Sequence, residues 1–229
     1  MSDTSFPSSA APATPTPLAL DTTVIRWSSQ PSADRPLLVF LHGYGADEHD
    51  LFALVPFLPP EFAVAAVRAP LTPPWPMPGY SWYAIEGLEN RDPRGVADAA
   101  SALSAWLDTL DPQPASIGLL GFSQGGAVAL QAMRLEPDRY AFAVNLSGYV
   151  TPGEVETDAA LAERRPPVFW GRGTHDDVIP PVLVTHTTQW LPEHVDLSGR
   201  VYQGLTHSIS EAELADVRTF LQKRLDEQK

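Results

Sequence analysis

One serine of the chain, Ser123, lies in the segment GFSQGG with a glycine two residues before it and another two residues after it. In a G-x-S-x-G turn between a strand and a helix, such glycines let neighbouring backbone approach closely, and the serine hydroxyl is presented to a substrate. A serine in this setting can act as the nucleophile of an acyl-transfer reaction. The same spacing also occurs in flexible loops, so the elements on either side of Ser123 decide between the two interpretations.

A nucleophilic serine needs a histidine that accepts its proton and a carboxylate that orients the histidine. Both residue types follow Ser123: Asp176 and Asp177 lie in THDDVIP, and His207 lies in THSIS. The order serine, acid, histidine is the chain order of hydrolases built on an α/β sheet. One aspartate is expected to orient His207 and the other to cap the adjacent turn or helix, and the spacing alone does not choose between them.

Five other histidines compete with His207 for the role of the base. They are His42, His49, His175, His186 and His194. Two of them precede the serine, His186 falls within a predicted helix, and His194 is predicted to lie in a loop before the last strand, which ends near Tyr202. Because only His207 lies between the last predicted strand and the last predicted helix, we assign the other five to surface or structural roles.

Acyl transfer also requires N–H donors that stabilise the developing oxyanion. The segment LHGYG ends a predicted strand and enters a glycine-containing loop, where hydrolases of this architecture supply one backbone donor. We therefore predict the Tyr44 N–H as one donor and the Gln124 N–H, which directly follows the serine, as the second. The alternative for HGYG is a plain tight turn.

Short apolar segments are typical of strands that are buried on both faces. Five of them occur here: PLLVFL (36–41), FAVAAV (62–67), IGLL (117–120), AFAVNL (141–146) and VFW (168–170). Helical patterns lie between these segments. One apolar stripe runs from Val96 to Leu110 behind an Asp92-Pro93 start signal, and QGGAVALQAMRL follows Ser123 directly.

The C-terminal region carries a further helix signal. Ser210 and Glu213 have the spacing of a capping box, and an amphipathic pattern follows them. Alternating strands and helices predict an α/β fold with a mostly parallel central sheet and helices on both faces. Ser123 then lies in a strand-turn-helix context, and the reactive loops gather at the carboxyl ends of the strands.

Length and composition predict one domain over residues 18–229, since 229 residues with 44% hydrophobic content can build one sizeable core. Residues 1–17 are rich in Ser, Thr, Ala and Pro and are predicted to be disordered. They do not read as a signal peptide, and no apolar run reaches transmembrane length, so stable membrane insertion is not expected.

The formal net charge of −13 argues against nucleic acid or an anionic membrane surface as a partner, because phosphates would be repelled. The chain has no cysteine, which excludes disulfides, a thiolate zinc site and a cysteine nucleophile. This composition is compatible with a reducing cytosol, where we expect the protein to be.

Together these motifs resemble the phospholipase/carboxylesterase family of α/β hydrolases, which includes acyl-protein thioesterases and small bacterial carboxylesterases. The resemblance extends from about Pro36 to the C-terminus through LHGYGADEHDL, RAP, SWY, GFSQGG, G-x-x-D-x-x-I-P and HSIS. It implies that Asp176 is the acid that orients His207 and that Asp177 is structural. It also places Trp82 near an acyl pocket and makes a homodimer plausible.

The segment APLTPPWPMPGY differs from the loop expected in a thioesterase for lipidated proteins, and HSIS is a form associated with bacterial members. We therefore predict a carboxylesterase that cleaves small-molecule esters without a cofactor or a metal ion. Some apolar residues of this region, Leu71 and Trp82 among them, are predicted to contact the acyl group. The prolines limit how far the loop can open, which favours short to medium acyl chains.

Other functions remain open at this point. The same residues could serve an acyl-thioesterase or a lysophospholipase, and a binding protein could retain the fold without the chemistry. A lyase has no motif in its favour. A metal hydrolase is the weakest alternative, because the HDD segment (175–177) offers ligands without a histidine pair at helical spacing.

Overall fold

The computed structural model describes residues 17–85 and 93–227, which form an α/β fold around a seven-stranded sheet. The strand order is β1-β3-β2-β4-β5-β6-β7, and only β1 runs antiparallel to its neighbour. The strands are β1 (Arg26–Trp27), β2 (Leu37–Leu41), β3 (Ala63–Val67), β4 (Ile117–Phe122), β5 (Phe142–Leu146), β6 (Pro167–Gly173) and β7 (Asp196–Tyr202). The predicted mostly parallel sheet is confirmed.

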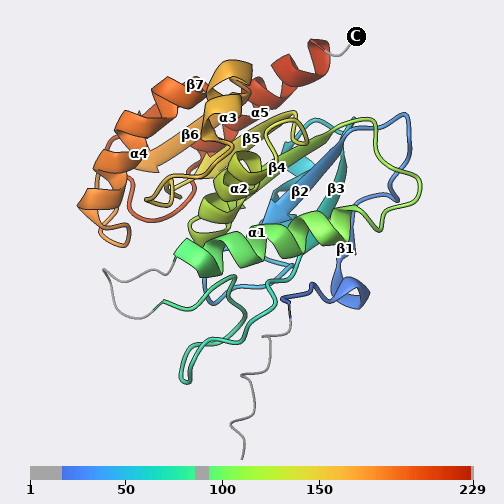
Figure 1. Cartoon of the computed structure of the whole chain (residues 1–229), viewed down its shortest axis with the longest axis horizontal. Coiled ribbons are helices and arrows are strands. Elements are labelled where there is room, and N and C mark those ends of the chain that lie inside the picture. Colours follow the sequence, from blue (N-terminus) through green and yellow to red (C-terminus); the bar gives the residue numbers. More distant parts are fainter. Residues whose placement is uncertain (1–16, 86–92, 228–229) are drawn as a thin grey trace, which may run out of the picture.

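Helices cover both faces of this sheet, as predicted (Figure 1). They are η1 (Thr22–Val24), η2 (Leu51–Phe57), α1 (Pro93–Leu107), α2 (Gln124–Leu135), α3 (Asp158–Arg164), α4 (Pro181–His194) and α5 (Glu211–Asp226). In β2, Leu37, Val39 and Leu41 pack in one cluster with residues of α1 to α4, whereas Leu38 and Phe40 pack with η2 and α5. Strands β2 and β3 are continuously apolar because both of their faces are buried.

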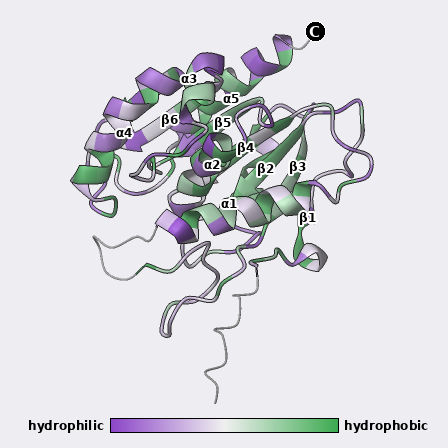
Figure 2. Cartoon of the chain, in the orientation of Figure 1, coloured by the Kyte–Doolittle hydropathy of each residue, from purple (hydrophilic) through white to green (hydrophobic). Residues whose placement is uncertain are grey.

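The core lies along the central strands, and the outer surfaces of the helices are polar. Figure 2 shows hydrophobic residues concentrated in the sheet, while outer helices such as α4 carry much hydrophilic surface. All five predicted strands are present, with ends that differ by no more than three residues from those expected. The predicted Asp92 cap of α1 and the N-terminal residues 1–16 lie outside the described residues.

The start of α5 agrees only partly with the predicted capping box. The Ser210 hydroxyl accepts a hydrogen bond from the Glu213 N–H at 3.1 Å, as expected. The Glu213 carboxyl does not complete the reciprocal bond, and neither of its oxygens has a hydrogen-bond partner within the described residues. It is instead fully buried against Gly171 of β6, where a Cβ atom would lie 2.1 Å from the Glu213 Oε1.

The predicted position of His194 is wrong. His194 is the last residue of α4 and does not lie in a loop. Its ring stacks on Trp190 with the centroids 3.7 Å apart, and its Nδ1–H donates to the Trp190 carbonyl oxygen at 2.8 Å. These contacts with the preceding turn accompany a helix that continues past Pro192 to His194.

Candidate active site

Ser123 occupies a strained turn between β4 and α2. Its φ of 53° and ψ of −114° are unusual for a residue with a side chain. Two glycines make this turn possible, because a Cβ on Gly121 would lie 2.3 Å from the Gly125 carbonyl oxygen, and a Cβ on Gly125 would lie 2.0 Å from that of Leu41. The Ser123 N–H donates to the Leu146 carbonyl oxygen at 2.8 Å. Ser123 is therefore part of a fixed, closely packed turn, and a flexible loop is excluded.

Ser123, His207 and Asp176 form one hydrogen-bonded chain. The His207 Nε2 lies 2.8 Å from the Ser123 Oγ, and the His207 Nδ1 lies 2.8 Å from the Asp176 Oδ2. The three residues follow β4, β7 and β6, so the parallel sheet brings its carboxyl ends together here. In a neutral His207, this arrangement requires the proton on Nδ1 and leaves Nε2 free to accept the serine proton.

Asp176 is held as a carboxylate, and Asp177 is not part of this chain. The Asp176 Oδ1 accepts hydrogen bonds from the Val178 and Ile179 N–H groups at 3.0 and 3.2 Å. Burial opposes ionisation, but the hydrogen bond and charge of His207, together with these N–H groups, keep the pKa of Asp176 below its usual value. Asp177 is exposed and has no hydrogen bond or ion pair within the described residues.

The two predicted oxyanion donors lie at the same site. Tyr44 follows β2, and Gln124 is the first residue of α2, where helix N–H groups point away from the helix without intrahelical partners. Neither the Tyr44 N–H nor the Gln124 N–H donates a hydrogen bond to another described residue. The Gln124 N–H also lies at the positive end of the α2 dipole, which favours negative charge beside Ser123.

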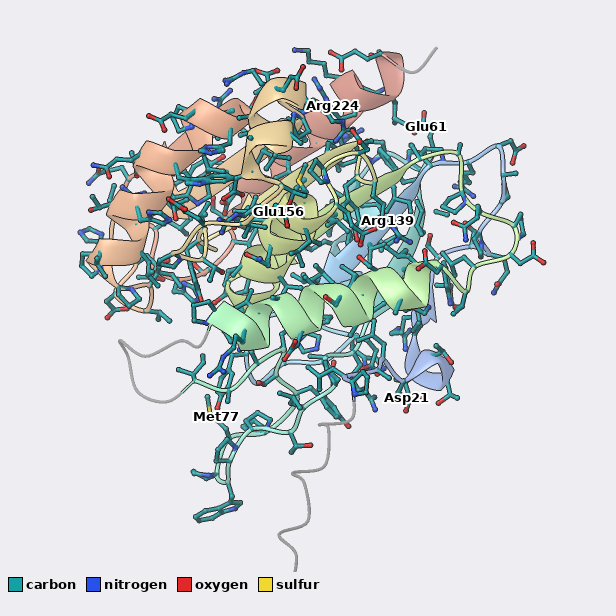
Figure 3. All side chains as sticks on the ribbon, viewed as in Figure 1. Asp21, Glu61, Met77, Arg139, Glu156 and Arg224 are labelled. Atoms are coloured by element: carbon teal, nitrogen blue, oxygen red, sulfur yellow. The ribbon has the colours of Figure 1, made fainter. Side chains whose placement is uncertain are left out.

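These residues share an open cleft of about 240 Å³. Its lining comprises Gly43, Tyr44, Ala46, Asp50, Met77, Ile85, Phe122, Ser123, Gln124, Val178 and His207. Met77 belongs to the long loop after β3, which extends from the body of the molecule (Figure 3). The cleft therefore combines an apolar wall with the reactive side chains at one end of the sheet.

Leu71 and Trp82 do not line this cleft. Leu71 pairs with Ser81 through backbone hydrogen bonds of 3.1 and 2.8 Å, and this pairing forms the base of the loop after β3. Trp82 is completely buried, and its indole N–H donates to the His42 carbonyl oxygen at 2.8 Å. Both residues therefore stabilise the loops beside the cleft, and their contact with an acyl group stays a prediction.

Comparison with known proteins identifies the family of this chain. The sequence matches the family described as Phospholipase/Carboxylesterase over residues 22–225, which is most of the chain. The chain belongs to this family. The resemblance predicted from the motifs is therefore confirmed.

Relatives of this phospholipase/carboxylesterase family member carry two kinds of name. A probable carboxylesterase of Oryza sativa subsp. japonica is 28% identical over 220 residues, covering 84% of this chain and 79% of the relative. Acyl-protein thioesterase 1 of Saccharomyces cerevisiae is 27% identical over 218 residues, covering 83% of this chain and 93% of the relative.

The similar solved structures also include an esterase and an acyl-protein thioesterase. Esterase PE8 has a TM-score of 0.73 at 28% identity and covers 91% of this chain and 99% of its own. Acyl-protein thioesterase 2 of Zea mays has a TM-score of 0.72 at 21% identity and covers 88% and 98%. The similarities support a hydrolase, but they do not separate esters from thioesters as substrates.

Several contacts that build the site in this family member were not predicted from the sequence. The Gln124 side chain accepts a hydrogen bond from the Trp82 N–H at 2.8 Å and donates one to the Tyr83 carbonyl oxygen at 2.7 Å. Glu48 and Arg68 form a two-pronged ion pair, with both N···O distances 2.6 Å. These contacts join the loops after β2 and β3 to the Ser123 turn. Their only signal in the sequence is that they lie in the quoted motifs.

His42 has the structural role expected for it. Its Nδ1–H donates to the Gly43 carbonyl oxygen at 2.7 Å, and its Nε2 accepts from the Ala69 N–H at 3.0 Å. Burial lowers the pKa of His42, so the ring is neutral and can make both bonds. The residue therefore connects the loop that contains Tyr44 to the end of β3.

The described residues offer one cluster of metal-type ligands, at Asp47, Glu48 and His49, whose ligand atoms lie within 4.8 Å of one another. Glu48 is already paired with Arg68, so this cluster is explained by the ion pair. The HDD segment forms no such cluster in the described part of the chain. Among the described helices, none combines the length and the apolar character needed to cross a membrane.

Proposed function

We propose that this protein is a serine hydrolase that cleaves carboxylic esters through an acyl-enzyme intermediate. The observation that carries the proposal is the hydrogen-bonded chain from Ser123 through His207 to Asp176, with both contacts at 2.8 Å, opening into an apolar cleft. A serine, a histidine and a buried carboxylate in this order are the groups that acyl transfer needs.

In the proposed reaction, the Ser123 Oγ attacks the ester carbonyl while the His207 Nε2 takes the serine proton. Asp176 holds the Nδ1–H of His207 and stabilises the imidazolium that forms. The Tyr44 and Gln124 N–H groups donate to the oxyanion of the tetrahedral intermediate. His207 then gives its proton to the leaving alcohol, and a second round with water releases the acid and restores Ser123.

We further propose that the acyl chain is short to medium in length. Met77, Ile85 and Val178 offer apolar surface to a substrate, but the cleft holds only about 240 Å³. Each buried methylene stabilises binding by about 0.8 kcal/mol, so kcat/KM should rise about fourfold per methylene until the cleft is full. Beyond that length, additional methylenes remain in water and should give no further increase.

The test is kcat/KM for p-nitrophenyl esters from acetate to palmitate, with matched thioesters and with Ser123→Ala as the control. We expect a maximum below palmitate and a loss of roughly 10⁴-fold or more in the Ser123→Ala variant, whose thermal unfolding should remain cooperative. Activity of that variant within tenfold of the parent would refute serine catalysis.

An acyl-thioesterase is the second candidate, since relatives with that name match over most of the chain. Its mechanism would use the same residues and differ only in the leaving group. A clear maximum at palmitate, or thioesters turned over far faster than esters, would replace the carboxylesterase proposal with this one.

A further inference from the structure

Asp50 is an exposed aspartate among the residues that line the cleft that contains Ser123 and His207. It precedes η2 at the N-cap position, but its side chain makes no capping hydrogen bond. Within the described residues, its carboxylate has neither a hydrogen bond nor an ion pair. Aspartate at such a position usually caps the following helix, so here the side chain remains available to a bound molecule.

The acidic neighbours of Asp50 differ from it, because each has a partner. Glu48 is paired with Arg68 at 2.6 Å, and Asp47 lies 3.3 Å from the His49 Nδ1. The guanidinium of Arg68 is thus already used, and it also lies over the Tyr80 ring at 4.4 Å. No Lys or Arg occurs in the cleft lining, and His207 is the only other titratable side chain of the lining besides Asp50 and Tyr44.

From this geometry we infer that Asp50 is a specificity-determining residue, which favours esters with a cationic group near the scissile bond and disfavours anionic esters. The inference rests on the proposed ester hydrolysis at Ser123. Because Asp50 and Ser123 line the same cleft of about 240 Å³, a charged group next to the scissile bond comes near Asp50, and charges roughly 8 Å apart interact even in partly aqueous surroundings.

The expected change in kcat/KM is modest for each charged substrate and larger for the ratio of the cationic to the anionic substrate. We expect one unit charge to change kcat/KM by about threefold, upward for a cation and downward for an anion. The ratio of cationic to anionic substrate should therefore change by about tenfold when the charge of Asp50 is removed. Because the cleft is open to solvent, salt near 1 M should remove most of this preference, since it shortens the screening length to about 3 Å.

The experiment compares Asp50→Asn with Asp177→Asn, which loses the same charge close to the site but outside the cleft lining. One substrate series varies the acyl end: p-nitrophenyl butyrate, its γ-trimethylammonio derivative and p-nitrophenyl monoglutarate. A second series varies the alcohol: butyrate esters of choline, of the uncharged dimethylbutanol and of hydroxypropionate, followed by acid release. In each series, the neutral ester normalises every variant for changes in folding or chemistry.

We expect the cationic-to-anionic ratio to fall about tenfold in Asp50→Asn in at least one series, and to change less than twofold in Asp177→Asn. Equal ratios in the parent and in Asp50→Asn for both series would overturn the inference, and so would an equal loss in both variants. If the parent protein hydrolyses none of the neutral esters, the proposed function fails instead, and the two failures are thus distinguished.

Discussion

Glu213 carries a fully buried carboxyl in the first turn of α5, and its ionisation should limit the stability of the protein at alkaline pH. Burial raises the pKa of Glu213 from its ordinary value of 4.5 to about 7. A carboxyl that is harder to ionise in the folded state contributes stability that is complete below pH 4.5 and is lost as the pH rises through about 7.

The size of this loss follows from the shift in pKa. A change from 4.5 to about 7, at 1.36 kcal/mol per unit, corresponds to about 3 kcal/mol, most of which falls between about pH 5 and pH 8. Glu213→Gln keeps the shape of the side chain and removes its charge. The free energy of unfolding of the parent should therefore fall by about 2 to 3 kcal/mol more than that of the variant over this range.

Urea denaturation of both proteins at about pH 5 and pH 8 measures this difference, because changes in all other titrating groups cancel between parent and variant. Glu211→Gln is the matched control, since Glu211 is exposed in the same helical turn. We expect this control to follow the parent. Parallel stability profiles for the parent and Glu213→Gln would show that Glu213 is already ionised or solvated in the folded protein, and would refute the reasoning.

Two further predictions concern the Ser123 turn and the adjacent aspartates. Asp176→Asn should lower kcat by about 10⁴-fold, because His207 loses the partner that fixes its tautomer. Asp177→Asn should leave kcat near that of the parent. The measurement is steady-state kinetics, and the reverse ranking of the two variants would contradict the assignment. Gly125→Ala should destabilise the protein by about 3 kcal/mol or more, because the new Cβ would lie 2.0 Å from the Leu41 carbonyl oxygen. Gly199→Ala is its control in chemical denaturation, since outside the adjacent residues the added Cβ would meet only the Leu197 side chain, at 3.7 Å. Equal stabilities of the two variants would contradict this account.

The positions of the strands and the mostly parallel character of the sheet could be predicted, because they depend on short-range patterns. Strands such as β2 are apolar at every position, which indicates burial on both faces, and the capping signal at Ser210 correctly marked the start of α5. The order of Ser123, Asp176 and His207 relative to these strands then predicted one site at the carboxyl ends. The choice of Asp176 over Asp177 came from the family resemblance, since two adjacent carboxylates have the same sequence pattern.

The remaining features depend on how loops pack against one another, which no local pattern specifies. Trp82 is buried with its indole N–H bonded to the His42 carbonyl oxygen, while its contact with an acyl group stays a prediction. Glu213 reads as half of a capping box, although its carboxyl fills the space that the missing side chain of Gly171 leaves. Each outcome is set by a residue more than 30 positions away in the sequence, so neighbouring residues could not reveal it.

Contacts between distant segments also explain how the proposed oxyanion site is held in place before a substrate arrives. Gln124 bonds through its side chain to the backbone of Trp82 and Tyr83, while its own N–H remains available beside Ser123. His42 bonds to Ala69 in the same loop after β3. The turn with the serine and the loop with the Tyr44 N–H are thus fixed to one common segment. Since stabilisation of an oxyanion depends on donors that need not reorganise during the reaction, these supporting bonds should matter for rate as much as the donors themselves.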